Sequence, residues 1–189
     1  MPVSPRLARA AKFAVIPAAL AVSGLLVAQS SYSAFSARTD NPGNSWASGS
    51  VALTDDDNGV AMFDVTNLKP GDSGSKCLTV TSNGSLPSDV RLYAEAGEAT
   101  KNLDQHLSLK ITQAASCDAA TKDTIFDGTL NEFHTSKTNF STGAGSWATA
   151  GGEGEKQAYT VAYTLSDDTP NSAQGGTAKV NFVWEAQNQ

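Results

Sequence analysis

The chain has 189 residues, which is the size of one domain and leaves little room for a second. Sixteen glycines, few aromatic residues and recurrent Thr and Ser are typical of a β protein with many turns, not of a helical bundle. The net charge of −6 argues against a nucleic-acid-binding protein, because binding needs Lys and Arg to displace the counterions of phosphates.

Residues 1–33 have the parts of a signal peptide. Arg6, Arg9 and Lys12 form its positive region, and a fifteen-residue apolar run follows at positions 13–27. That run is shorter than the ~20 residues of a typical membrane span. The sequence therefore predicts export with cleavage and no stable membrane span afterwards; an uncleaved N-terminal anchor is the alternative.

Two cleavage points fit the rule of small residues at alternate positions, one after Ser33 and one after Ser36. A cut between Ser33 and Ala34 removes three basic residues and changes the net charge from −6 to −9. Strong like charge keeps an exported protein soluble. We expect the mature chain to be secreted, or attached to the cell surface through other molecules.

Cys77 and Cys117 are the two cysteines of the chain. In an oxidising compartment such a pair usually forms one disulfide, and closing a loop of this length stabilises a fold by roughly 4 kcal/mol in the chain-entropy model. Two unpaired thiols are the alternative. Their spacing gives no CxxC motif of a redox or zinc site.

Alternation of apolar and polar residues predicts about eight strands with one solvent-facing side, the main ones at residues 46–54, 60–65, 75–82, 88–96, 107–111, 159–165 and 178–186. A helical turn is expected at 103–106, capped by Asn102, and a short helix at 128–133, capped by Thr129 with Glu132 three residues on. Residues 135–154 are expected to be the least structured stretch. The fold class is therefore all-β, a two-sheet sandwich with one or two short helices in its connections.

Few residues offer a catalytic or metal-binding pattern. The chain lacks HExxH, so only a chance meeting of His106 and His134 with a carboxylate would make a zinc site. A serine-nucleophile elbow and a phosphate-binding loop are also missing from the sequence. The acidic run at 55–59 is expected to be a solvated hairpin turn, with a calcium site as the sharper alternative. We therefore expect no enzyme activity, no cofactor and no resident metal.

Four segments, in order along the predicted mature chain, resemble the TasA/camelysin family of exported bacterial surface and biofilm-matrix proteins. The first joins Ala34 and Phe35 to the strand WASGSVAL at 46–53. The second is the turn NLKPGD at 67–72, and the third is VTSNGSL at 80–86. The fourth is QG at 174–175 with the closing VNFVWEAQ at 180–187. The cysteine pair and a shorter middle are departures from the family pattern.

The resemblance implies a jelly-roll-like sandwich and processing by a dedicated signal peptidase, which favours the cut after Ser33. For TasA-like members it implies head-to-tail homopolymers in which each subunit lends an N-terminal strand to the next. Residues 34–44 would form this arm, ahead of a β-sandwich domain at 45–189. The expected assembly residues are Ala34, Phe35, Ser36, Ala37, Arg38 and Thr39.

Camelysin-like members are labelled metallo-endopeptidases, but the resemblance brings no recognisable zinc motif to this sequence. The expected function is a secreted structural protein whose partners are itself, the signal peptidase and other matrix or cell-wall components. A surface metallo-endopeptidase and a monomeric adhesion or sugar-binding module are the alternatives. Because the aromatic residues fall mainly at inward strand positions, we expect core packing more than a sugar-stacking surface.

Overall fold

Two antiparallel sheets make up the described part of the protein, a computed structural model that describes residues 36–40, 53–56, 61–120 and 122–188. The strands within these residues are β1 Ser36–Asp40, β2 Leu53–Asp55, β3 Ser73–Ser82, β4 Ser88–Ala99, β5 Leu107–Ala114, β6 Asp123–Thr129, β7 Ala144–Thr149, β8 Glu155–Leu165 and β9 Ala178–Asn188. The predicted all-β sandwich is confirmed.

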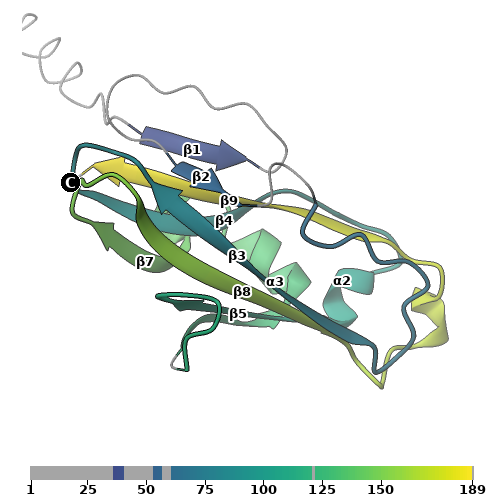
Figure 1. Cartoon of the computed structure of the whole chain (residues 1–189). Coiled ribbons are helices and arrows are strands. Elements are labelled where there is room, and N and C mark those ends of the chain that lie inside the picture. Colours follow the sequence, from purple (N-terminus) through teal and green to yellow (C-terminus); the bar gives the residue numbers. More distant parts are fainter. Residues whose placement is uncertain (1–35, 41–52, 57–60, 121, 189) are drawn as a thin grey trace, which may run out of the picture. The chain divides into compact units, whose positions relative to one another are not determined.

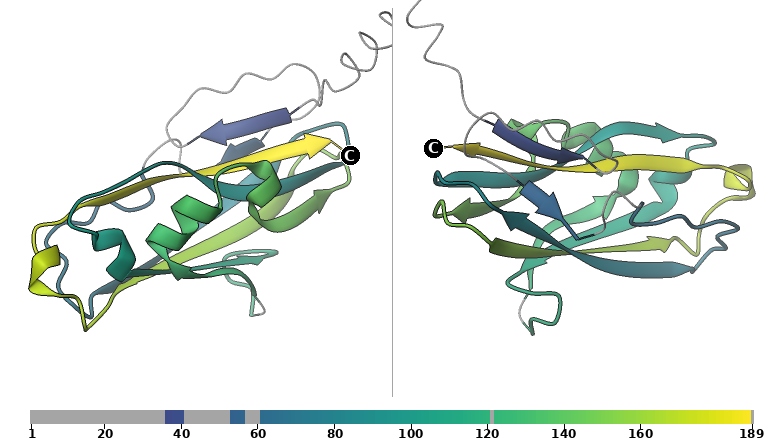
Figure 2. Two further views of the ribbon diagram at one scale, coloured as in Figure 1. Left: turned by 180° about the vertical axis from the view of Figure 1, so that it is seen from behind. Right: turned by 45° about the horizontal axis from the view of Figure 1, so that its top comes forward.

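The strand order is β1-β9-β4-β7 in the four-stranded sheet and β2-β3-β8-β5-β6 in the five-stranded sheet. The chain crosses from one sheet to the other repeatedly, so that neighbours in sequence seldom pair. The two short strands β1 and β2 end their sheets on the same side of the sandwich, as Figures 1 and 2 show. This side is where the predicted arm enters the fold.

The core lies between the sheets and follows the alternation of the sequence. Leu78 and Val80 of β3 are buried, as predicted, and so are Val90 and Leu92 of β4. Trp184 of β9 packs against Tyr159 of β8, with ring centroids 5.5 Å apart. Aromatic rings of this kind bury large apolar areas and dominate the energy of a core.

The turn at 67–72 is also confirmed. The amide of Asp72 donates to the carbonyl of Lys69 at 2.9 Å, and the Lys69 amide donates to the Asp72 carboxylate at 2.8 Å. Gly71 has φ +86°, a left-handed conformation that strains any other L residue. Its N–H donates to the carbonyl of Leu165, which ties the turn to the end of β8.

Two strand predictions were wrong. Residues 61–65 form no strand, and Val65 is 46% exposed. Met62 and Phe63 pack against the core, and the Phe63 ring meets Tyr163 edge-on at 5.1 Å, so side-chain packing and not a backbone ladder holds the segment. Residues 135–154, expected to be the least structured stretch, contain the 3₁₀ helix η1 Phe140–Thr142 and strand β7. Small inward residues such as Ala144 hide the alternation of β7.

Two short helices fill connections. In α3, Leu130–Ser136, the predicted capping box is present, since Thr129 Oγ1 accepts from the Glu132 amide and Glu132 accepts from the Thr129 amide. Helix α2, Leu103–His106, forms where predicted, but Asn102 has φ 55° and its side chain makes no cap bond. Among the described residues, no helix is long and apolar enough to span a membrane. A second 3₁₀ helix, η2, covers Asn171–Ala173.

Candidate assembly edge

Strand β1 contains the described part of the predicted arm and lies antiparallel beside β9. The register pairs Ser36 with Gln187, Ala37 with Ala186, Arg38 with Glu185, Thr39 with Trp184 and Asp40 with Val183. The other predicted arm and cleavage residues, Ser33, Ala34 and Phe35, lie outside the described residues. The arm segment is therefore the terminal strand of the four-stranded sheet.

The position of β9 does not depend on β1. On its other side β9 pairs with β4 along its whole length, from Ala178 opposite Ala99 to Asn188 opposite Ser88. By contrast, β1 pairs with only five residues of β9. Removing β1 would free the N–H and C=O groups of alternate residues within Val183–Gln187, because the residues between them bond to β4. An open sheet edge of this kind readily pairs with another strand.

On the outward face of the sheet, the Glu185 carboxylate next to β1 is held in place. Tyr93 Oη donates to Glu185 Oε2 at 2.8 Å, and Gln187 Nε2 donates to Glu185 Oε1 at 2.9 Å. Tyr93 is only 4% exposed although its alternation predicts an outward, solvated position, so that expectation was wrong. The ring lies on the outer face between β4 and β9 and anchors the carboxylate.

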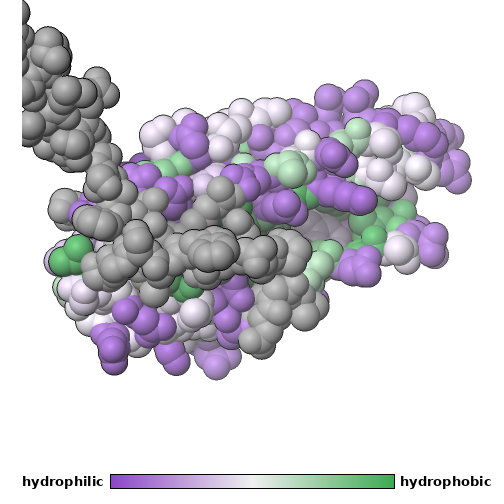
Figure 3. Space-filling view, turned by 90° about the horizontal axis from the view of Figure 1, so that it is seen from above, coloured by the Kyte–Doolittle hydropathy of each residue, from purple (hydrophilic) through white to green (hydrophobic). Residues whose placement is uncertain are grey.

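The five-stranded sheet ends on the same side with β2, which pairs Leu53 with Ser82, Thr54 with Thr81 and Asp55 with Val80. The Asp56 carboxylate accepts the amide of Thr79 at 2.9 Å and so extends the edge contact beyond the strand. In the predicted acidic turn, Asp57, Asn58 and Gly59 lie outside the described residues. In Figure 3, which shows this side, described polar side chains dominate, and a hydrophobic patch borders a hollow toward one end.

The two histidines do not form a shared metal site. His134 Nε2 lies 2.8 Å from Asp104 Oδ2, and Asn131 Nδ2 donates to the same oxygen at 2.8 Å. His106 instead offers its backbone carbonyl to the amide of Ser166 at 2.9 Å. Within the described ranges, no group of three or more His, Cys, Asp or Glu side chains is arranged to hold a metal ion.

The Asp104 network joins helix α2 to helix α3. Burial raises the pKa of the Asp104 carboxyl, but the hydrogen bonds from His134 and Asn131 and the charge of His134 outweigh it, and the net pKa is lowered. Gly97 of β4 lies so close to the His134 ring that a Cβ there would come within 2.5 Å of it. The half-buried imidazole thus packs against β4 and links helix α3 to helix α2.

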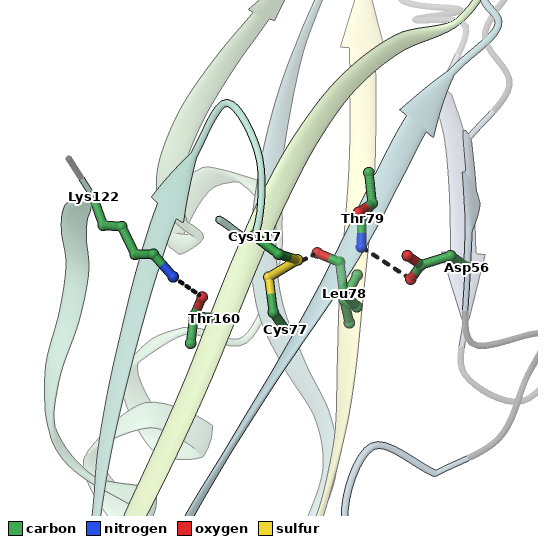
Figure 4. Close-up of a disulfide and its surroundings, with 7 residues drawn as sticks. All are labelled: Asp56, Cys77, Leu78, Thr79, Cys117, Lys122 and Thr160. Atoms are coloured by element: carbon green, nitrogen blue, oxygen red, sulfur yellow. Dashed lines mark hydrogen bonds between the residues drawn. A yellow bond between two sulfur atoms is a disulfide. The ribbon is translucent and has the colours of Figure 1, made fainter. Parts of the chain in front are cut away.

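Figure 4 shows the disulfide between Cys77 of β3 and Cys117 in the loop after β5. The pairing predicted from the sequence is present, with the two Cα atoms 5.8 Å apart and a sequence separation of 40. Since β8 lies between β3 and β5, the loop after β5 must reach across β8 to bring Cys117 to Cys77. Lys122 Nζ donates to Thr160 Oγ1 at 3.0 Å, so the loop is fixed to this face at a second point.

A comparison with protein families finds a match to the model described as camelysin metallo-endopeptidase. The match covers residues 6–189, nearly the whole chain. No curated protein matches the sequence.

Proposed function

Since the chain belongs to the camelysin metallo-endopeptidase family, the TasA/camelysin family, we propose that it is a secreted structural protein of the bacterial cell surface or biofilm matrix. In this proposal its subunits assemble into fibres, and each subunit donates its N-terminal arm to the next. The fibre role rests on the resemblance to TasA-like members and on the edge position of β1.

One observation carries the proposal: the arm segment Ser36–Asp40 is an edge strand on β9. A backbone ladder does not distinguish a strand of the same chain from the same strand of a neighbour. If the neighbour's residues 36–40 take this place in the same register, every hydrogen bond of the ladder is kept. A cut after Ser33 would leave the new N-terminus two residues ahead of Ser36, where it can reach an adjacent subunit.

The test compares the mature protein, starting at Ala34, with a form that lacks residues 34–42. We expect fibres by electron microscopy and fast sedimentation for the first form only. A synthetic peptide of residues 34–44, added to the truncated form, should bind with one peptide per subunit and cap the open edge. Unchanged fibres from the truncated protein would contradict the proposal, and near-ultraviolet circular dichroism shows that its fold is intact.

The family description favours a second candidate, a metallo-endopeptidase. His134 is already hydrogen-bonded to Asp104, which argues against a role as a zinc ligand. We therefore propose that the chain is not an enzyme and holds no cofactor. Metal content and casein cleavage by the purified mature protein test this, with His106→Ala and His134→Ala as variants. Stoichiometric zinc together with cleavage that either variant abolishes would establish the peptidase instead.

A third candidate is a monomeric adhesion or sugar-binding module. Size-exclusion chromatography of the correctly processed protein separates it from the fibre proposal. A single sharp monomer peak at all concentrations, together with glycan binding, would favour the module.

A further inference from the structure

The register between β1 and β9 places three charged residues in one row across the four-stranded sheet. Arg38 lies directly opposite Glu185, and Glu185 lies directly opposite Arg91 of β4. The row therefore alternates positive, negative and positive. Oppositely charged residues that lie directly across from each other stabilise a strand pair, and like charges destabilise it.

Two hydrogen bonds hold the Glu185 carboxylate in position. Its two carboxylate oxygens accept from Tyr93 and Gln187, which fixes the direction of the side chain. The cation on the other side, Arg91, forms an ion pair with Asp89 at 2.8 Å and faces the Phe140 ring at 5.2 Å. Glu185 thus presents a fixed negative charge beside the edge to which the arm adds.

We propose that Glu185 is the residue that selects the register of the arm, by recognising the positive charge at position 38. For an arm that comes from another subunit, this inference rests on the proposed function. The same choice of register applies when β1 pairs with β9 of its own chain.

Comparison with the slipped registers shows why one charged residue of the arm is enough to select the observed register. A slip by one residue exchanges the two faces of the arm. A slip by two in one direction places Asp40 opposite Glu185, so that two negative charges meet. A slip by two in the other direction places Arg38 opposite Val183, which is fully buried, and loses the opposite charge. Only the observed register pairs Arg38 with Glu185.

Cysteine cross-linking measures the register directly, because the two native cysteines are bonded to each other. Ala37→Cys with Ala186→Cys reports the observed register and leaves the charged row intact. Ala37→Cys with Asn188→Cys reports the slip that brings Asp40 to Glu185. Each pair is built into the mature protein and oxidised, and the products are separated on non-reducing gels.

We expect the 37–186 product to dominate in the parent. Arg38→Glu should lower the ratio of the 37–186 product to the 37–188 product by roughly three- to tenfold, as the energies of cross-strand charge pairs imply. Arg38→Lys should keep the parent ratio. The matched control is Lys179→Glu, which makes the same charge change at an exposed residue of β9 beyond the part paired with β1. Moving the cation, with Arg38→Thr and Asp40→Arg together, should make the 37–188 product the major one.

An unchanged ratio in Arg38→Glu, or an equal change in Lys179→Glu, would overturn the inference. So would the absence of the 37–186 product in the parent. The proposed function is read separately from the same gels, since it requires cross-links between chains. Cross-links found only within single chains would refute strand donation, while the ratio would still decide whether residue 185 selects the register.

Discussion

The edge that carries β1 and the face that carries the disulfide are built in opposite ways. At the edge, a five-residue strand is added to a sheet that β4 and β9 already complete. On the face, a covalent bond joins β3 to the loop after β5 across a strand between them. The disulfide and the long ladder between β4 and β9 thus lie outside the segment that we propose is exchanged.

Breaking the disulfide should have the largest effect. Replacing both Cys77 and Cys117 by Ala should lower the free energy of unfolding by about 4 kcal/mol, because the unfolded chain loses the closed loop. Urea denaturation with and without the bridge measures this. If the arm-deleted form lost as much stability as the cysteine variant, the contrast between face and edge would be wrong.

Disrupting the Asp104 hydrogen-bond network should have the second-largest effect on the free energy of unfolding. Asp104→Asn removes a buried charge that accepts hydrogen bonds from His134 and Asn131, and we expect a loss of about 1–3 kcal/mol. The exposed Asp168→Asn serves as the control and should stay within about 0.5 kcal/mol of the parent. Because the pKa of Asp104 is lowered by folding, its contribution is present above its unfolded pKa and is lost as the pH falls through the folded pKa. The two proteins should therefore converge in acid.

Hydrogen exchange should sharpen the comparison without any mutation. Amides in the ladder between β1 and β9 should exchange faster than those between β4 and β9, since an edge strand can open locally while the sheet stays closed. Exchange of the processed monomer, resolved by residue, gives the two rates. Equal protection of the two ladders would argue that β1 is an integral strand and is not exchanged.

The smallest effect concerns the loop between β7 and β8. The Glu155 carboxylate accepts from the backbone amides of Ala150, Gly151 and Gly152, and these bonds lower its pKa. Stability from this source is present above the unfolded pKa and disappears as the pH falls through the folded one. Glu155→Gln should flatten the acid side of the profile of melting temperature against pH, and Glu153→Gln should leave it unchanged.

Much of this fold can be predicted from the sequence, because its signals are local. Alternation in residues 75–82 and 159–165 places the inward residues correctly, and the spacing of Thr129 and Glu132 predicts a cap that forms. The family match agrees with the resemblance, and the disulfide agrees with the pairing expected of the two cysteines. These signals need only the periodicity of one element or the chemistry of one turn.

The remaining features depend on contacts between distant segments. Tyr93 is buried and its hydroxyl donates to Glu185, which is 92 residues away in sequence, and no pattern within β4 shows that. Residues 60–65 alternate like a strand, but in the structure the side chains of Met62 and Phe63 anchor this segment by packing against the core. The opposition of Arg38 and Glu185 follows from which strands are neighbours, and alternation alone does not determine that.

The pairing of Ser36 with Gln187 has a practical side. The start of the first described strand and the end of the last one lie next to each other, so that anything attached after Asn188 begins beside the arm. A purification tag or fluorescent protein placed there would sit at the edge under study and compete for its space. Labels for imaging such a protein are better placed in the loop between β8 and β9, which lies at the opposite end of β9 from Asn188.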